Sequence, residues 1–448
     1  SVANLEDLLE SERTILTRLD KYIRLSEEKT KFLKRQKEQM KNEIKDASKD
    51  PISFLSNPIN AFLLMKRLID DYKKIDNLMQ MGLEVHLFDD SIKQPSNNDY
   101  KGVVESMGHL QELYNLKAED LARGEILGQV KTRELASDEC YTIGVIMTQT
   151  KQHELAIAWL REALRRWSVE PEKAISKFEI LDFLTYSMAE DGQYQESLKY
   201  INQMLKIDPK HEATLKKKEV VEQWLSHIEQ NGPKQKPSKP HRGLYEPLCR
   251  GEYQRTPAQV ANLRCRYESK NSSFLKIAPF KLEEASLDPL IVIYHNAISD
   301  KEIDQIIQVS KPMLKRSMVG ESFSKEVSNE RTNYDFELVK VLSLRTEDMT
   351  GLDRKSYESL QVNNYGIGGF YLPHFDWVRT NEPISDVEQG GATVFPQIGV
   401  GVFPKKGSAI FWYNLLPDGT GDERTLHGAC PVLLGSKWGM FCMQQYFC

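Results

Sequence analysis

The chain changes character at residues 231–243 (NGPKQKPSKPHRG), a stretch rich in Pro, Lys and Gly that favours neither helix nor strand. Before this stretch, apolar residues recur at helical spacing. After it, short runs of β-branched and aromatic residues alternate with turns that contain Gly and Pro. At 448 residues the chain is also too long for one core. The sequence therefore predicts a multidomain α + β protein, with helical domains first and a β domain last.

Composition narrows the possible functions. The hydrophobic content of 40% and the charged content of 28% are typical of a soluble protein with buried cores. The formal net charge of −5 argues against bulk binding of nucleic acid, which usually requires a basic surface. No apolar run approaches the roughly eighteen residues of a membrane span.

Residues 1–48 are predicted to form one long amphipathic helix. Steps of four and three from the first leucine give a largely apolar seam: Leu5, Leu9, Glu12, Leu16, Leu19, Ile23, Ser26, Thr30, Leu33, Lys37 and Met40. Such a seam favours a coiled coil and hence self-association. The alternative is a helix that packs on its own domain.

Residues 140–225 contain an internal echo at helical spacing. The apolar pattern of Ala156–Leu160 recurs 41 residues later at Ser197–Ile201. This spacing predicts tetratricopeptide-like helix pairs, whose concave face commonly holds an extended peptide. Phe183, Tyr186 and Tyr194 are candidate groove residues, because aromatic rings hold proline-rich backbones in the polyproline II conformation. The alternative is that these rings pack in the core between helices.

The residue pattern after the linker predicts a β domain. A strand is expected at Leu290–His295 and a helix at Asp300–Leu314. Further strands are expected at Leu360–Tyr365, Tyr371–Trp377, Ala392–Phe395, Ser408–Asn414, Ala429–Leu434 and Lys437–Tyr446. Many short strands separated by turns favour a sandwich or a jelly-roll barrel.

A set of metal-binding residue types lies within these strands. His374 and Asp376 are expected on one face of a strand, since side chains alternate with period two. His427 supplies a third ligand, and two His with one carboxylate form the facial triad of non-haem Fe(II) oxygenases. Lys437 follows ten residues later and could pair with a carboxylate of a 2-oxo acid on the metal. Zinc hydrolases also use two His and an Asp, but no separate general base is evident.

Longer segments then resemble the α subunits of the collagen prolyl 4-hydroxylase family. In the β region the resemblance is carried by residues 360–376 (LQVNNYGIGGFYLPHFD), 390–396 (GGATVFP), 404–407 (PKKG), 411–415 (FWYNL) and 427–432 (HGACPV). Upstream it is carried by residues 57–62 (NPINAF), 65–68 (MKRL), 138–140 (DEC), 181–186 (LDFLTY), 248–252 (LCRGE) and 264–267 (RCRY). The likeness covers nearly the whole chain.

The resemblance implies a fold, a chemistry and a cellular setting. It implies a double-stranded β-helix (jelly roll) that binds Fe(II) through His374, Asp376 and His427. It further implies that Lys437 and Tyr365 hold 2-oxoglutarate, and that ascorbate rescues oxidised iron. The family works in the lumen of the endoplasmic reticulum, where two α chains join two protein disulfide isomerase subunits.

The resemblance also implies covalent features. It implies disulfides Cys249–Cys265 and Cys430 to a C-terminal cysteine, preferably Cys448 rather than Cys442. The sequon at Asn271 predicts glycosylation. The domains expected from all of these features are a helical dimerisation domain at 1–135, a peptide-substrate-binding domain at 136–230, a linker at 231–243 and an oxygenase domain at 244–448.

One departure from the family stands beside the site. After Pro383 the family has a loop and a full core strand with a Thr that helps to hold 2-oxoglutarate, and this chain lacks that length. We therefore expect an interrupted barrel with unpaired strand edges and weaker binding of iron and 2-oxoglutarate.

These observations predict an enzyme that hydroxylates peptidyl proline at C4 in collagen-like Gly-X-Y repeats. One alternative is a Pro-rich peptide-binding scaffold subunit with an impaired oxygenase domain. Another is an oxygenase that acts on a different substrate.

Overall fold

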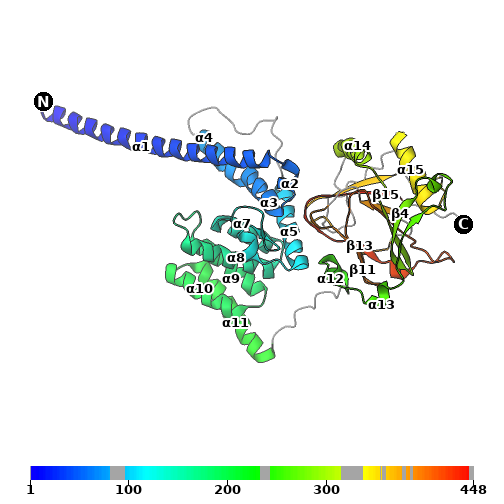
Figure 1. Cartoon of the computed structure of the whole chain (residues 1–448). Helices are drawn as coiled ribbons and strands as arrows, with labels where there is room; N and C mark the ends of the chain where they lie inside the picture. The colour runs from blue at the N-terminus through cyan, green and yellow to red at the C-terminus, as the bar shows by residue number, and fades with distance from the viewer. Residues whose placement is uncertain are drawn as a thin grey trace. The chain divides into compact units, whose positions relative to one another are not determined.

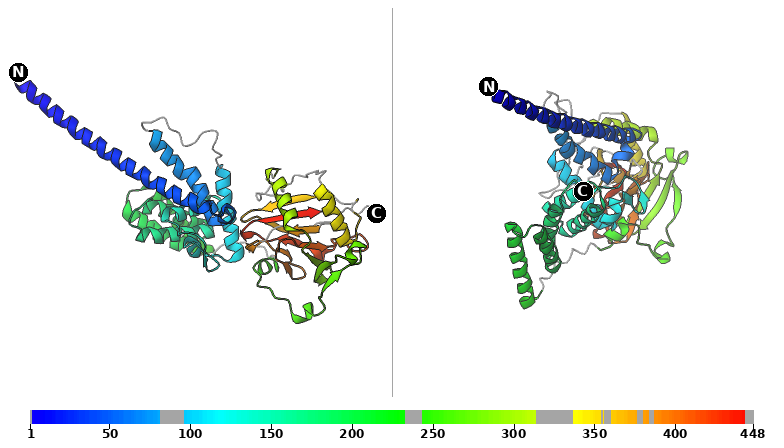
Figure 2. Two further views of the ribbon diagram at one scale, coloured as in Figure 1. Left: turned by 45° about the horizontal axis from the view of Figure 1, so that its top comes forward. Right: turned by 90° about the vertical axis from the view of Figure 1, so that its left-hand side faces the viewer.

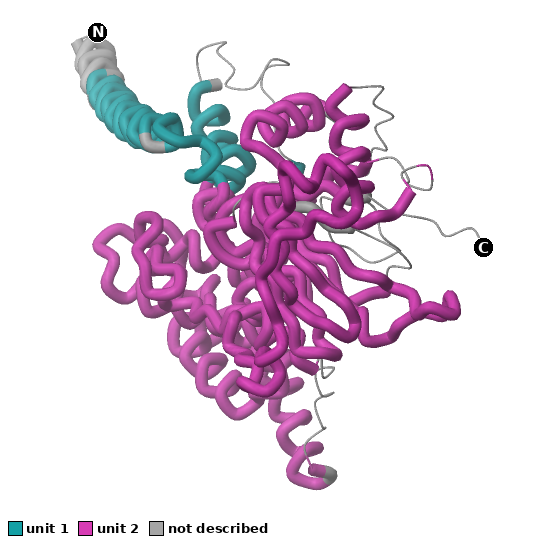
Figure 3. Tube along the Cα trace, turned by 45° about the vertical axis from the view of Figure 1, so that its right-hand side comes forward, with its two compact units in different colours: residues 1–55, 64–96 teal, residues 56–63, 97–448 magenta. Residues whose placement is uncertain are grey.

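The computed structural model describes residues 2–80, 96–232, 243–313, 337–353, 355, 360–375, 380–383 and 387–442. The chain divides into two compact units, one of residues 1–55 and 64–96 and one of residues 56–63 and 97–448 (Figure 3). Within the described ranges, no helix is both long enough and apolar enough to cross a membrane.

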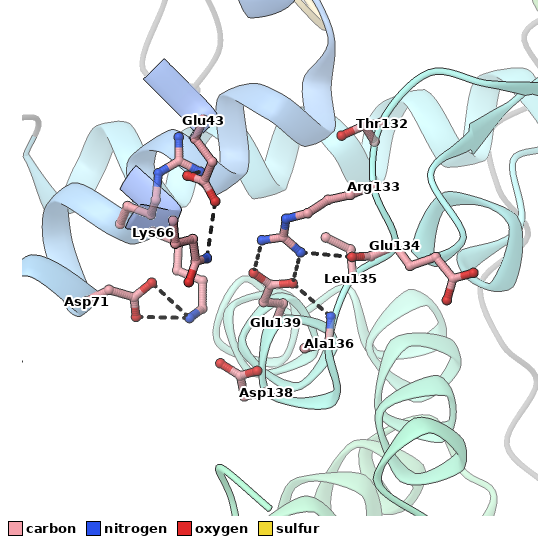
Figure 4. A network of polar contacts seen from close by, with 12 residues as sticks. Glu43, Lys66, Asp71, Thr132, Arg133, Glu134, Leu135, Ala136, Asp138 and Glu139 are labelled. Atoms are coloured by element: carbon pink, nitrogen blue, oxygen red, sulfur yellow. Dashed lines mark hydrogen bonds and ion pairs between the residues drawn. The ribbon is translucent and has the colours of Figure 1, made fainter. Parts of the chain in front are cut away.

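The first unit is dominated by the helix α1, Val2–Ala47, which runs unbroken for 46 residues (Figure 1). It is followed by α2 (Pro51–Leu55), α3 (Pro58–Lys66), the π-helical turn η1 (Arg67–Asp71) and α4 (Tyr72–Gln80). Two ion pairs stabilise this corner: Arg67 lies 2.8 Å from Glu43 on α1, and the buried Lys66 lies 3.2 Å from Asp71 (Figure 4). Helix α1 confirms the single helix predicted for residues 1–48.

The second unit begins with a mainly helical part. It contains α5 (Asn97–Tyr114), α6 (Ala118–Ala122), the short strands β1 (Glu125–Ile126) and β2 (Gln129–Val130), α7 (Ser137–Gln149), α8 (His153–Val169), α9 (Lys177–Glu190), α10 (Tyr194–Ile207) and α11 (Glu212–Asn231). The 41-residue echo corresponds to two helix pairs, α7–α8 and α9–α10, so the predicted tetratricopeptide-like arrangement is confirmed. Apolar side chains from α8, α9 and α10 form one cluster, which includes Leu160, Leu184 and Met204.

Local polar contacts set where these helices begin. The Arg133 guanidinium donates to both carboxylate oxygens of Glu139 at 2.9 and 2.6 Å, and Glu139 accepts from the Ala136 amide ahead of α7 (Figure 4). At the start of α9, the Ser176 hydroxyl accepts from the Glu179 amide, and the Glu179 carboxylate returns to Ser176. Both pairs satisfy amides that the first turn of a helix leaves unbonded.

The β region follows the linker and builds two main sheets. Its elements are α12 (Tyr245–Cys249), α13 (Pro257–Val260), β3 (Cys265–Glu268), β4 (Phe280–Leu287), β5 (Leu290–His295), α14 (Asp300–Ser310), α15 (Glu337–Thr350), β6 (Gln361–Tyr365), β7 (Tyr371–His374), β8 (Thr380–Pro383), β9 (Gln389–Gly390), β10 (Thr393–Phe395), β11 (Val400–Val402), β12 (Ala409–Trp412), β13 (His427–Ala429), β14 (Val432–Leu434) and β15 (Lys437–Cys442). The larger sheet has the order β3-β4-β5-β12-β8-β15-β6, and the smaller has β11-β10-β13-β7.

The prediction of a gap in the barrel is wrong for the larger sheet. The four-residue strand β8 lies between β12 and β15 and pairs antiparallel with both, at Phe411↔Thr380 and Cys442↔Thr380 among others. Strand β8 begins only six residues after His374. The connection is short, but the hydrogen-bonded ladder between β12 and β15 is still filled by a strand. The described backbone therefore has a strand where two unpaired edges were predicted.

Apolar side chains fill both faces of the larger sheet. On one face, Ile303 and Ile306 of α14 and Leu342 of α15 join a cluster with sheet residues such as Phe411. Figure 2 shows the ribbons of helices lying over this sheet. On the other face, Ile291, Ile410 and Trp412 meet residues of the smaller sheet: Phe395, Val400 and Val402. The two sheets are thus packed against each other, and helices cover the outer face of the larger one.

Candidate active site

The two histidines predicted as metal ligands lie directly opposite each other. His374 ends β7, His427 begins β13, and the two residues are partners in the antiparallel ladder. Their ring centroids are 4.5 Å apart, and His427 is buried. Strand pairing therefore brings together two imidazoles that are 53 residues apart in the sequence.

Backbone carbonyls fix the tautomer of both rings. His374 Nδ1 lies 2.7 Å from the Leu372 carbonyl oxygen, and His427 Nδ1 lies 3.0 Å from the Thr425 carbonyl oxygen. A carbonyl can only accept, so each Nδ1 carries the proton and donates. An imidazole whose single proton is on Nδ1 has its lone pair on Nε2, which is the arrangement that metal-binding histidines adopt.

The third predicted ligand, Asp376, lies outside the described residues. Across the described ranges, no cluster of three or more His, Cys, Asp or Glu side chains could hold a metal ion. The two imidazoles nevertheless fit a metal: they face each other from paired strands, and the same carbonyl-held tautomer occurs in both.

A buried cation lies on the strand next to the site. Lys437 is the first residue of β15, pairs with Tyr365 of β6 and is only 2% exposed. Burial lowers the pKa of Lys437 to about 8, because the ammonium group loses its hydration. Its Nζ lies 5.6 Å from the centre of the Tyr365 ring, so the two residues predicted to act together are neighbours.

Sequence reasoning missed one hydroxyl beside Lys437. The buried Thr393 of β10 has its Oγ1 3.4 Å from Lys437 Nζ. The missing length after Pro383 predicts a site without the family's threonine, whereas Thr393 supplies a hydroxyl from another strand. The signal was present in the segment GGATVFP at 390–396, whose alternation turns Thr393 and Phe395 to one side of the strand.

The three aromatic residues predicted to line the peptide groove differ in packing and exposure. Phe183 packs edge-on against Tyr141 and joins the apolar cluster of the repeat. Tyr194 stacks on Trp224 of α11. Tyr186 is 46% exposed and meets His153 edge-on. Each ring thus contacts a different ring, and Tyr186 is the most exposed of the three.

The predicted disulfide pairing is corrected by the structure. Cys249 is bonded to Cys430 across a Cα–Cα distance of 5.5 Å. The reason is packing, since Cys249 ends α12, which contacts β10, and Cys430 directly follows β13, the neighbour of β10. Cys265 instead begins the edge strand β3, where it is exposed and unbonded. Cys448 lies outside the described residues.

The predicted glycosylation residue is already engaged. Asn271 Nδ2 donates to the carbonyl oxygens of Asp348 and Met349 on α15, at 3.1 Å in each case. A glycan on that nitrogen would have to replace these hydrogen bonds.

Comparison with known proteins assigns the family. A family model for the N-terminal region of the prolyl 4-hydroxylase α subunit matches residues 1–128, and one for the prolyl 4-hydroxylase peptide-substrate-binding domain matches residues 137–227. The chain is 32% identical to prolyl 4-hydroxylase subunit alpha-1 of Homo sapiens, over 98% of this chain and 91% of that protein. It is 33% identical to subunit alpha-2 of Gallus gallus, with 98% and 91% covered, and 33% identical to subunit alpha-2 of Caenorhabditis elegans, with 98% and 89% covered.

Among solved structures, the chain is similar to a viral collagen prolyl hydroxylase from Paramecium bursaria Chlorella virus-1 in its 2OG complex. The identity is 22%, the TM-score is 0.28, and 35% of this chain and 96% of that chain are covered. The sequence relatives decide the class, because they are α subunits of prolyl 4-hydroxylase that match nearly the whole chain. The chain belongs to the prolyl 4-hydroxylase α-subunit family.

Proposed function

We propose that this chain hydroxylates peptidyl proline at C4 in collagen-like Gly-X-Y repeats. In the balanced reaction, one oxygen atom of O₂ enters the C4–H bond, and the other converts 2-oxoglutarate to succinate and CO₂. The observation that carries the proposal is the His374–His427 pair, held by matching Nδ1–carbonyl bonds, in a chain of this family.

Fe(II) is the proposed metal, held by His374, Asp376 and His427. When bound, it would supply the redox chemistry that couples decarboxylation to hydroxylation, with ascorbate keeping it ferrous. The chain's own contribution is to orient the two imidazoles and to shield them. Trp412 and Phe395 lie 4.8 and 5.7 Å from the His427 ring and exclude water from that side.

We assign the 2-oxoglutarate pocket to Lys437, Tyr365 and Thr393. A charged Lys437 would pair with the carboxylate that points away from the metal, and the two hydroxyls would donate to the same carboxylate. Among the described residues no carboxylate pairs with the buried Lys437 ammonium, whose burial is costly, and a bound dianion would offset that cost. The sheet orders support a double-stranded β-helix around this pocket, since β8 and β15 of one sheet alternate along the chain with β7, β10 and β13 of the other.

The remaining assignments follow the family. Residues 136–230 are proposed to bind proline-rich peptide through Tyr186 and neighbouring rings, residues 231–243 to act as linker and residues 244–448 to form the oxygenase domain. Residues 1–135 are proposed to dimerise through a coiled coil, since Leu16, Leu19 and Ile23 of α1 are 45–56% exposed. Protein disulfide isomerase is the proposed partner, and the lumen of the endoplasmic reticulum the proposed location.

The test is a decarboxylation assay on the full chain, coexpressed with protein disulfide isomerase. Succinate should form only with Fe(II), 2-oxoglutarate and a Pro-Pro-Gly repeat peptide together, and the product should contain 4-hydroxyproline. Peptide binding without succinate would favour the scaffold subunit. Succinate without 4-hydroxyproline would favour an oxygenase with another substrate.

A further inference from the structure

The loop that connects β12 to β13 is closed at its base by one buried residue, Asn414. Asn414, which is 3% exposed, uses its backbone carbonyl to accept from the Asp422 amide at 2.9 Å. Its side-chain Oδ1 accepts from Trp412 Nε1 at 2.8 Å. The orientation of the amide follows from chemistry, because an indole nitrogen only donates and so must face the oxygen.

Both contacts of Asn414 lead to His427. The Trp412 ring lies 4.8 Å from the His427 ring at 64°, an edge-to-face contact. From Asp422 the loop continues in a tight turn, in which the Thr425 amide and hydroxyl both donate to the Asp422 carbonyl at 3.0 and 2.7 Å. That turn presents the Thr425 carbonyl to His427 Nδ1 at 3.0 Å. The Trp412 contact therefore fixes the plane of the His427 ring, and the Thr425 carbonyl fixes its tautomer.

The turn itself is held from the outside by an ion pair. Arg424 donates to both carboxylate oxygens of Asp422, at 2.8 and 2.7 Å. Hydrogen bonds from Arg424 hold the pKa of Asp422 below its usual value, so the carboxylate stays charged. Asn414 thus connects two features: its backbone carbonyl binds the turn at Asp422, and its side chain binds Trp412 beside His427.

We infer that Asn414 is a positioning residue for His427: its side chain acts through Trp412, and its backbone carbonyl holds the Asp422–Thr425 turn. The inference rests on the proposed metal site. Groups that hold a metal-binding histidine by its second nitrogen change metal affinity about 10- to 100-fold when removed. Asn414 acts one step further out, so we expect an effect near the lower end of that range.

The experiment uses Co(II), whose visible absorption reports binding without turnover. In the full chain, Asn414→Leu keeps the volume but removes the acceptor for Trp412, and should weaken Co(II) binding about tenfold. Asn414→Asp keeps an acceptor oxygen and should restore most of the affinity. Thr346→Val on α15 is the matched control, because it also deletes one buried side-chain hydrogen bond, to the Leu342 carbonyl. It should bind Co(II) like the parent.

A second readout needs no metal. The ¹H shifts of the His427 ring in the metal-free chain, which the facing Trp412 ring displaces, should change in Asn414→Leu. The ¹⁵N shifts should report the same Nδ1–H tautomer in the parent and the variant, because the backbone carbonyl of residue 414 still accepts from the Asp422 amide. If that variant does not fold, Trp412→Phe removes the same hydrogen bond from the other side and should weaken Co(II) binding to a similar extent. Parent-like Co(II) affinity and parent-like ring shifts in a folded Asn414→Leu would overturn the inference, as would an equal loss of affinity in Thr346→Val. Failure of the parent to bind Co(II) in a His374-dependent way would instead overturn the metal site.

Discussion

The helical repeat and the β region both bury complete apolar clusters, but they assemble them over different distances in the sequence. In the repeat, α8, α9 and α10 are successive helices that share one cluster. In the β region, β15 pairs with β6 from more than seventy residues earlier, and that pairing brings Lys437 opposite Tyr365. A substitution in the repeat should therefore be felt locally, whereas one in the β region should reach the site.

The largest expected effect tests this contrast with two histidines. His427→Ala removes a proposed metal ligand and should reduce succinate formation to the uncatalysed background. His211→Ala removes the cap of α11, where His211 Nδ1 accepts from the Thr214 amide, and should cost only about 1 kcal/mol of stability. Succinate release and urea denaturation measure the two outcomes. Substantial iron-dependent turnover by His427→Ala would contradict the assigned site.

The second test compares two fully buried apolar residues. Leu184→Ala in the repeat should lower the free energy of unfolding by about 2–5 kcal/mol, because it leaves a cavity among α8, α9 and α10. Its affinity for 2-oxoglutarate should stay at the parent value. Val432→Ala removes less volume but packs with Tyr365, so it should also weaken 2-oxoglutarate binding. Calorimetric titration measures the affinity for 2-oxoglutarate, and denaturation measures the free energy of unfolding. Equal 2-oxoglutarate affinities in Leu184→Ala and Val432→Ala would contradict the predicted difference between the two regions.

The third test uses pH to sharpen the role of Lys437. Its pKa of about 8 lies below the usual value of about 10.4, so the ammonium loses its proton as pH rises through 8. Affinity for 2-oxoglutarate should then fall, by about tenfold for each pH unit above 8. The unfolded chain holds this proton up to about pH 10.4, so the stability of the ligand-free protein should rise over the same window.

Lys437→Arg is the control for this pH dependence. Arginine remains charged at every pH used, so the affinity of this variant should show no fall above pH 8. A parent protein whose 2-oxoglutarate affinity is flat between pH 7 and 9.5 would show that Lys437 is not the group that binds the dianion.

Prediction from sequence succeeded where contacts are local. The period of apolar residues was enough for α1 and for the helix pairs around Ala156 and Ile201, since each helix meets its neighbour in the chain. Strand β8 was missed, because four residues with one Pro carry no pattern of their own and take their conformation from β12 and β15. The Cys249–Cys430 disulfide was missed for a similar reason. The packing of α12 against the sheet brings the two cysteines together, and the sequence does not show that packing. The metal and Lys437 assignments stay predictions.

The smallest expected effect separates two aromatic residues of α9, Tyr186 and Phe183. Tyr186 is largely exposed, so Tyr186→Ala should leave stability nearly unchanged but weaken binding of a proline-rich peptide several-fold, in line with about 0.5–1.5 kcal/mol for an aromatic contact. Phe183 packs on Tyr141 and on the cluster of the repeat, so Phe183→Ala should lower stability first. Peptide titration of the full chain, followed through tyrosine signals, measures binding, and thermal melting measures stability. If Tyr186→Ala lowered the melting temperature as much as Phe183→Ala, then Tyr186 would be a packing residue, because a groove residue loses solvent contact only when peptide binds.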